Sequence, residues 1–392
     1  MVAMTRMNSA RNDDVVRASR GKVLPAVIVE PLSSPPPGGR VRTVVFLHGW
    51  PDSPVLWEPQ YKALAQLGGY RCISLPLSGY EATFPPRLQN DGILTTTAGS
   101  PSSTSDPTPT FDSAVLDVAA SIKAYSTRGD GDGDGVILIC HDWGCLIGYR
   151  LQRRFPELVE RMVALDVGND TQGLTTKELA FIVAYQAWLL SAYLVGGRVG
   201  DGMTTWFARF SRAPSLEPGG IDNRAPPPSA SSSSSSAGKR RSGSSIPSAR
   251  NWPYLRYWQE KWTEWRRRGG GSSGSGDGGT RGRGERESEA EAEEAEGEAG
   301  QGSRRGRGGR LARVPSCPLL YMHGADKPAR FHGDRWIADV RASGGRVVEV
   351  ENAGHWFQVT HADRVNEVLI GWLKDTAEEP STSAPRQHRS AL

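Results

Sequence analysis

The stretch "GVILICHDWGCLIGYRL", residues 135–151, decides the fold of this chain. A continuous apolar run ends at His141 and Asp142, and an amphipathic segment starts at Trp143. This order predicts a buried strand, a sharp turn and a helix, with Asp142 at the tip of the turn. An ionised carboxylate is costly to remove from water, so at such a place it usually has a partner or a chemical role. The simplest role is that of a helix N-cap, a position that Asp favours.

Strand-like and helical segments alternate on both sides of this turn. Segments 23–30 and 41–49 flank a Pro/Gly turn, which suggests a hairpin. Four further strand-like segments are "YRCISLPL" (70–77), "RMVALDVG" (161–168), "CPLLYMHG" (317–324) and "RVVEVENAGH" (346–355). Strands that are apolar throughout and alternate with helices predict an α/β fold, in which a mostly parallel sheet is flanked by helices.

Segment 169–265 has a different character, because it is helical, unusually aromatic and without a strand signal. It follows the end of a strand, where open α/β sheets bind their ligands. We therefore predict a helical cap, or lid, although a packed satellite would have a similar composition. The cap divides the α/β core into residues 20–168 and 314–376.

Two low-complexity inserts interrupt the chain: a Ser-rich one within the cap (226–250) and one rich in Arg, Gly and Glu (266–313). Neither has apolar periodicity, so both are predicted to be disordered. A Thr/Ser/Pro-rich stretch, 91–112, is predicted to be a long surface loop. The net charge is +4, and the Glu block of the second insert largely cancels its arginines. A solvated spacer is the better interpretation, and no nucleic-acid binding is expected.

Membrane insertion and secretion are not indicated by the sequence. The most apolar segment, 180–197, is interrupted by Gln186 and Ser191, so we expect no membrane span. The N-terminus lacks the apolar run of a secretory signal, which makes a cytoplasmic location the expectation. The four cysteines have no CxxC spacing. No metal and no cofactor are expected, and the oligomeric state stays open.

Three further motifs follow other predicted strands. "LHGWPDS" (47–53) can present the backbone N–H of Trp50 to an oxyanion, "HGADKP" (323–328) contains Asp326, and "NAGHWFQ" (352–358) contains His355. Together with Asp142 they have the order nucleophile, acid, histidine, which is that of the α/β-hydrolase triad. We therefore predict Asp142, Asp326 and His355 as catalytic residues.

The position of the acid has alternatives, because Asp326 follows Gly324 by two residues, whereas α/β hydrolases of this kind more often space the two by three. Asp166 and Asp170, which follow the earlier strand "VAL", are the alternatives. We rank Asp326 ahead of both.

These motifs together resemble the epoxide hydrolases of the α/β-hydrolase fold. The similar segments are "HGWPDSPVLWEPQYKALAQLGGYRCISLPLSGY", "CHDWG" and "GHWFQVTHADRVNEVLIGWLKD". "HDWG" alone is shared with haloalkane dehalogenases, which have the same Asp nucleophile, and Cys140 stands where the usual turn has its first glycine.

The resemblance gives the carboxylate a chemical role. A carboxylate can displace a leaving group at an sp3 carbon, and water can then hydrolyse the resulting alkyl ester. In this scheme His355 activates the water, Asp326 orients His355, and the backbone N–H groups of Trp50 and Trp143 form the oxyanion hole. The product of an epoxide would be a vicinal diol.

Opening an epoxide also requires a hydrogen bond to the departing oxygen, for which the family uses a pair of cap tyrosines. The resemblance implies Tyr185 and Tyr254, with Tyr193 and Tyr257 as rivals. The expected substrate is a small molecule, an apolar epoxide, whose size the sequence leaves open. Haloalkane dehalogenation is the first alternative, and a non-catalytic ligand-binding protein with this fold is the second.

Overall fold

The computed structural model describes residues 21–35, 40–81, 93–96, 108–126, 135–214, 245–267 and 313–376. The two predicted inserts lie mostly outside these residues. Their disorder and the limits of the domains therefore stay predictions.

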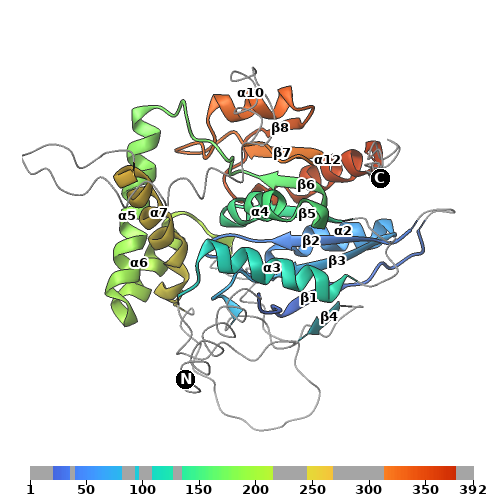
Figure 1. The fold of residues 1–392 in the computed structure, drawn as a ribbon, viewed down its shortest axis with the longest axis horizontal. Helices are drawn as coiled ribbons and strands as arrows, with labels where there is room; N and C mark the ends of the chain where they lie inside the picture. The colour runs from blue at the N-terminus through green and yellow to red at the C-terminus, as the bar shows by residue number, and fades with distance from the viewer. Residues whose placement is uncertain are drawn as a thin grey trace, which may run out of the picture.

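A sheet of eight strands forms the centre of the described chain, in the order β4-β1-β3-β2-β5-β6-β7-β8 (Figure 1). The strands are β1 (Ala26–Val29), β2 (Arg42–Leu47), β3 (Tyr70–Leu75), β4 (Ile93–Thr96), β5 (Val136–His141), β6 (Val159–Leu165), β7 (Leu319–Gly324) and β8 (Arg346–Val350). All neighbours from β3 to β8 are parallel. The predicted α/β fold with a mostly parallel sheet is confirmed.

The N-terminal edge of the sheet differs from the prediction in two ways. The expected hairpin between 23–30 and 41–49 is wrong, because β1 pairs antiparallel with β3 and β4 instead of β2. Both edges of β2 are occupied by parallel partners, β3 and β5, so β1 has no free edge of β2 to join. The predicted loop 91–112 contains β4, which extends this edge by one strand.

Helices cover both faces of the sheet (Figure 1). On one face α3 (Phe111–Tyr125) packs beside α4 (Trp143–Arg154), and on the other α2 (Glu58–Leu67) contacts α12 (Ala362–Asp375). The shorter helices α10 (Asp334–Ala342) and α11 (Phe357–Thr360) complete the second half. Because both faces are covered, β5 is buried along its whole length, as its unbroken apolar run requires.

A separate group of helices lies at one end of the sheet, at the left in Figure 1. It consists of α5 (Thr176–Val195), α6 (Gly197–Phe210), a 3-10 turn (Ser248–Asn251) and α7 (Trp252–Arg267). Within the described residues, α5 is the one helix that is long and apolar enough to cross a membrane by length and composition. This differs from the expectation that no apolar run would suffice. In this fold, however, Gln186, Leu189 and Ala192 of α5 are buried within the protein.

Candidate active site

Asp142 occupies the sharp turn between β5 and α4. Its φ of 51° and ψ of −124° place it in a region that residues other than glycine rarely adopt. The backbone of Gly49 packs directly against this turn. Position 49 must be a glycine, since a Cβ there would lie 2.3 Å from the Cβ of Asp142. Although Asp142 is at the N-cap position of α4, its side chain makes no capping hydrogen bond. The carboxylate of Asp142 therefore does not act as a helix N-cap, which was the simplest structural role for it.

The carboxylate instead accepts hydrogen bonds from backbone amides at the tip of the site. The N–H of Trp50 donates to Oδ2 of Asp142 over 2.8 Å, and the backbone amide of Trp143, the next residue, lies close enough to lower the pKa of this carboxylate. The two predicted oxyanion-hole donors thus meet at the predicted nucleophile. Burial raises the pKa of Asp142, while the charge of His355 and these two amides counteract part of the increase.

The loop that carries Trp50 is fixed by residues that the sequence did not single out. His48 is fully buried, contacts the carbonyl of Gly49 through Nδ1 at 2.8 Å and accepts a hydrogen bond from the N–H of Leu77 at Nε2. Burial lowers the pKa of His48 to about 3, so this ring is neutral. The indole of Trp50 donates to Oδ1 of Asn251 over 2.7 Å, which ties the loop to the cap.

His355 lies between two carboxylates. Its Nδ1 is 2.5 Å from Oδ2 of Asp166, and its Nε2 is 3.9 Å from Oδ1 of Asp142. Burial by itself lowers the pKa of His355, but its hydrogen bond and charge interaction with Asp166 outweigh burial and raise the pKa. Because Nδ1–H donates to Asp166, Nε2 is the ring nitrogen that faces Asp142 and can accept a proton there.

The leading expectation for the acid, Asp326, disagrees with this geometry. Asp326 is exposed, and its described contact is the backbone hydrogen bond from its N–H to the carbonyl of Ala353. Asp166 is fully buried at the end of β6, and its φ of 73° turns its side chain towards His355. The other alternative, Asp170, accepts from Arg313 and from the N–H of Gln172. Of the three carboxylates, only Asp166 reaches the histidine.

Asp166 has a second charged partner that sequence reasoning missed. Lys327 follows Asp326 in the loop after β7, and its ammonium pairs with Oδ1 of Asp166. Both side chains are almost completely buried, at 3% and 0% exposure. Burial would raise the pKa of Asp166, but Lys327 and His355 together lower it well below its ordinary value. Asp166 is therefore ionised, and Lys327 compensates a charge that would otherwise be buried without a permanent counterion.

The cap places two of the four candidate tyrosines above Asp142. Tyr254 is buried, and its ring contacts the indole of Trp143 edge-on at 5.1 Å between centroids. The ring of Tyr185 lies 6.1 Å from that of Tyr254. Burial raises the pKa of both hydroxyls, so both keep their protons and can donate. Tyr193 is less suited, because its hydroxyl is 2.7 Å from the hydroxyl of Thr108.

Tyr257 stays a rival on position alone, since its ring also contacts Trp143, at 5.9 Å. It is only partly buried, and the ammonium of Lys261 lies over its ring. The charge of Asp142 acts on the hydroxyls of Tyr185 and Tyr254 but is not among the influences on Tyr257, so the first two are the pair near this carboxylate.

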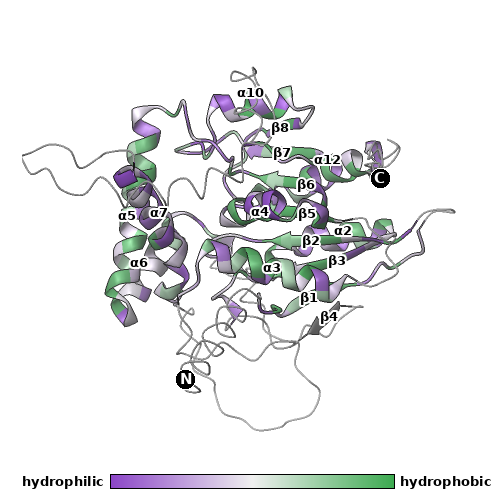
Figure 2. Ribbon diagram, viewed as in Figure 1, coloured by the Kyte–Doolittle hydropathy of each residue, from purple (hydrophilic) through white to green (hydrophobic). Residues whose placement is uncertain are grey.

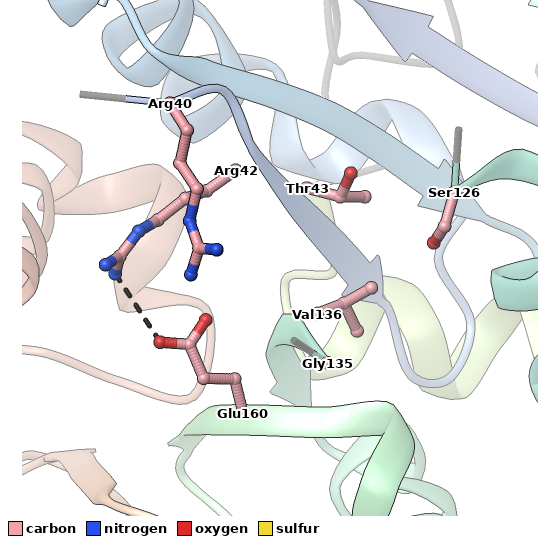
Figure 3. Close-up of a pocket in the computed structure, with 7 residues that line it drawn as sticks. All are labelled: Arg40, Arg42, Thr43, Ser126, Gly135, Val136 and Glu160. Carbon is pink, nitrogen blue, oxygen red and sulfur yellow. Dashed lines mark ion pairs between the residues drawn. The ribbon is translucent and has the colours of Figure 1, made fainter. Parts of the chain in front are cut away.

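A hollow at the other end of the sheet has no part in this arrangement. Figure 3 shows it at the amino-terminal ends of β2 and β5, where Arg42 and Glu160 form an ion pair of 3.6 Å. Its volume of about 20 Å³ is room for roughly one water molecule. No group of acidic, histidine or cysteine side chains suited to a metal ion occurs within the described part of the chain.

Comparisons with known proteins agree with this architecture. Residues 44–368 match the model of the alpha/beta hydrolase family. The chain is 31% identical over 122 residues to epoxide hydrolase srdG of Neurospora crassa, which is 31% of this chain and 29% of that protein. It is 23% identical over 124 residues to epoxide hydrolase 1 of Caenorhabditis elegans, covering 32% and 24%. These alignments span less than a third of the relatives' length.

Among solved structures, an epoxide hydrolase from Bacillus megaterium superimposes with a TM-score of 0.51 at 16% identity, over 89% of this chain and 96% of that one. At this identity the similarity concerns the fold alone. The family match extends over most of the chain, on both sides of the cap. The chain belongs to the alpha/beta hydrolase family.

Proposed function

We propose that this hydrolase adds water to a small, apolar epoxide and forms a vicinal diol through an alkyl ester on Asp142. The observation that carries the proposal is the position of one carboxylate between three groups: the backbone amides of Trp50 and Trp143, the Nε2 of His355 at 3.9 Å, and the cap tyrosines Tyr185 and Tyr254. A serine at this turn would favour attack on carbonyl carbons, whereas a carboxylate favours displacement at an sp3 carbon.

The two oxygens of Asp142 have different surroundings, which suggests how the first step proceeds. Oδ2 is held by the N–H of Trp50, whereas Oδ1 faces His355. Oδ1 is therefore the oxygen that forms the bond to the epoxide carbon. The carbon–oxygen bond of the epoxide breaks, and the departing oxygen takes a proton from Tyr254 or Tyr185. The ester retains Oδ2 as its carbonyl oxygen, still beside the two N–H donors.

Hydrolysis of the ester then uses His355. Its separation of 3.9 Å from Oδ1 is longer than a hydrogen bond. A water molecule between them can lose its proton to Nε2 and attack the carboxyl carbon of Asp142, and the resulting oxyanion is stabilised by the N–H groups of Trp50 and Trp143. When the intermediate collapses, the alkoxide of the diol takes the proton from His355. The second proton of the water remains on the Asp142 carboxyl group and passes through solvent to the tyrosinate, so that both side chains regain their starting state. Asp166 orients the ring and stabilises its charged form.

The test is a single turnover in heavy-oxygen water. If Asp142 is the nucleophile, the label enters Asp142, and the first diol carries an unlabelled protein oxygen. His355→Gln should form the ester but release diol very slowly, so the mass of the peptide containing Asp142 should increase by that of the substrate. The matched control is His361→Gln, since His361 is distant from Asp142 in the fold and its described side-chain hydrogen bond is to the neighbouring Thr360 hydroxyl. Heavy oxygen appearing directly in the first diol, with the protein unlabelled, would refute the covalent mechanism.

Haloalkane dehalogenation is the second candidate, and one observation favours it. The indole N–H of Trp143 is buried next to Asp142 and meets no acceptor at hydrogen-bond geometry within the described residues. Such a donor suits a halide, which leaves without a proton. The hydroxyls of Tyr185 and Tyr254 favour an epoxide, whose departing oxygen needs a proton. Measuring halide release and diol formation on matched haloalkane and epoxide substrates separates the candidates, and turnover of neither would favour a binding protein.

A further inference from the structure

Helices α5 and α6 form a hairpin that exposes several large apolar side chains, unlike an ordinary surface helix. An amphipathic helix normally buries its large apolar side chains and exposes polar ones. On α6 the buried side chains are small or polar, whereas three of its large apolar residues are exposed; Phe207 differs, since it packs inward on Tyr185. The buried residues are Gly200, Thr204, Thr205 and Ala208, and the exposed ones are Val199, Trp206 and Phe210.

The outward side of α5 continues this apolar surface. Trp188 contacts Trp206 at 5.2 Å between ring centroids, and Trp206 stacks on Phe210 at 5.7 Å. The exposed fractions of Trp206 and Phe210 are 56% and 62%. We use the name outer cap face for the exposed apolar residues of this hairpin: Val183, Trp188, Leu194, Val195, Val199, Trp206 and Phe210. Figure 2 shows hydrophobic residues along much of both helices.

Single exposed apolar side chains are ordinary, but a continuous patch of this kind marks an interaction surface. Packing against the core does not require the patch, because other residues of the same helices do that. Tyr185 and Leu189 of α5 face the protein interior, and Tyr185 contributes to the candidate active site. The outer cap face is thus the reverse side of the helix that covers Asp142.

Positive charge surrounds these aromatic residues. Arg198, Val199, Gly202, Trp206, Arg209 and Phe210 follow one another at helical spacing, and all are exposed. Arg198, Arg209 and the nearby Arg212 have no acidic partner in the part of the chain that the structure describes. Asp201, the acidic residue of α6, is bonded to the N–H and hydroxyl of Ser248. The face therefore combines aromatic and aliphatic groups with uncompensated arginines.

We infer that the outer cap face docks on an anionic lipid surface, with α5 and α6 lying in the plane of the interface. Tryptophan and arginine beside aliphatic residues are the composition that binds at the boundary between lipid headgroups and acyl chains. A second copy of this chain fits less well, because a two-fold contact would place the arginines of one copy opposite those of the other. This inference does not depend on the reaction proposed above.

The helix lies on the membrane in this arrangement and does not cross it. Crossing would require α5 to leave its contacts in the protein, where Gln186, Leu189 and Ala192 are buried. An interfacial position keeps these contacts and places only the outer cap face in the lipid. It would bring the cap close to apolar substrates dissolved in the bilayer. The expected cytoplasmic location stays a prediction, and it is compatible with binding to the anionic inner face of a membrane.

The experiment is flotation of the full chain with vesicles of phosphatidylcholine, either alone or with phosphatidylserine. We expect the partition coefficient to be higher for vesicles that contain phosphatidylserine than for vesicles of phosphatidylcholine alone. Binding to the phosphatidylserine vesicles should weaken at high salt. Arg198→Glu/Arg209→Glu should lower that coefficient by at least about tenfold. Trp206→Ser/Phe210→Ser should lower it on both kinds of vesicle. The matched control is Arg153→Glu/Arg341→Glu, which reverses two exposed arginines in the last turns of α4 and α10.

Sedimentation velocity of the same proteins without vesicles tests the alternative, in which the outer cap face binds a second copy of this chain. The inference is wrong if the wild-type chain does not float with either kind of vesicle, or if the Arg153 and Arg341 control loses as much binding as the α6 variants. A concentration-dependent dimer that Trp206→Ser/Phe210→Ser abolishes would assign the face to a second copy and also overturn it. The circular dichroism spectrum and the midpoint of thermal unfolding should be unchanged in all variants, which shows that each is folded and keeps this test separate from that of the reaction.

Discussion

Replacing Asp166 with Asn tests the arrangement of the site most directly. The substitution keeps the size of the side chain but removes the charge that faces Nδ1 of His355 at 2.5 Å. Asp326→Asn is the matched comparison, because Asp326 is exposed and lies in the loop after the adjacent strand. We expect the first change to slow hydrolysis of the ester strongly and the second to have almost no effect.

The expected size of the effect lies between two limits. A hydrogen bond between charged groups contributes about 1.5–3 kcal/mol, which sets the lower limit at roughly tenfold to a hundredfold. Coulomb's law over 2.5 Å with an effective dielectric constant of about 20 gives roughly 7 kcal/mol, an upper limit that neglects relaxation. A loss of about 10²–10⁴-fold in kcat is the expectation for Asp166→Asn. The comparison variant Asp326→Asn should stay folded, because a substitution at an exposed position changes the free energy of unfolding by at most about 0.5 kcal/mol.

The assay follows diol formation and the mass of the intact protein in the same samples. Because His355 acts after the ester has formed, Asp166→Asn should accumulate the alkyl ester, whereas Asp326→Asn should not. Asp166→Asn also leaves Lys327 buried without a carboxylate, which could destabilise the fold. The double variant Asp166→Asn/Lys327→Met removes both charges and should remain folded but slow. If Asp326→Asn lost as much activity as Asp166→Asn, the pairing of Asp166 with His355 would not be the functional one.

Three further predictions concern the same groups. Tyr254→Phe should reduce the rate of ester formation roughly 10- to 100-fold, as measured by rapid quench, while Tyr193→Phe reacts normally; the reverse result would assign the hydroxyl to Tyr193. His355 must be neutral to accept a proton, and its pKa is raised above the ordinary 6.5. The rate of ester hydrolysis should therefore decrease as the pH falls through a value above 6.5, and a decrease that begins only below 6.5 would contradict this. Lys327→Met should lower the free energy of unfolding in urea by about 3–5 kcal/mol, because it leaves the Asp166 carboxylate buried without its counterion, whereas Lys62→Met, which breaks an exposed pair with Glu58, should have little effect.

Local sequence was sufficient to predict the elbow and its neighbours. The strand, the turn and the helix around Asp142 are adjacent in the chain, and their apolar pattern and small residues determine the conformation there. Local sequence also predicted the Trp50 loop and the position of His355, each of which lies in the loop after a strand of the sheet. Because parallel strands bring their carboxyl ends to one edge, the order of these motifs predicted that they would meet.

The choice between Asp166 and Asp326 depended on tertiary structure. Both residues follow neighbouring strands, β6 and β7, so the pattern of the sequence places both near the same edge. The left-handed turn at Asp166 directs its side chain inward, whereas the next loop exposes Asp326 and sends Lys327 into the site. No periodicity encodes these directions, since they result from how two loops pack against each other. The position of β1 beside β3 was also beyond local reasoning, because it depends on which strand edges remain free.

The cap shows the same division between sequence and tertiary structure. Its helices and its aromatic composition could be predicted from residues 169–265, but the direction in which each side of a helix faces could not. An apolar helix is expected to bury its large side chains, whereas the buried side chains of α6 are small or polar, and Trp206 and Phe210 remain exposed. Only the packed structure decides that Tyr185 faces Asp142 while Trp206 and Phe210 face outward, because burial is a property of the assembled surface and not of the helix alone.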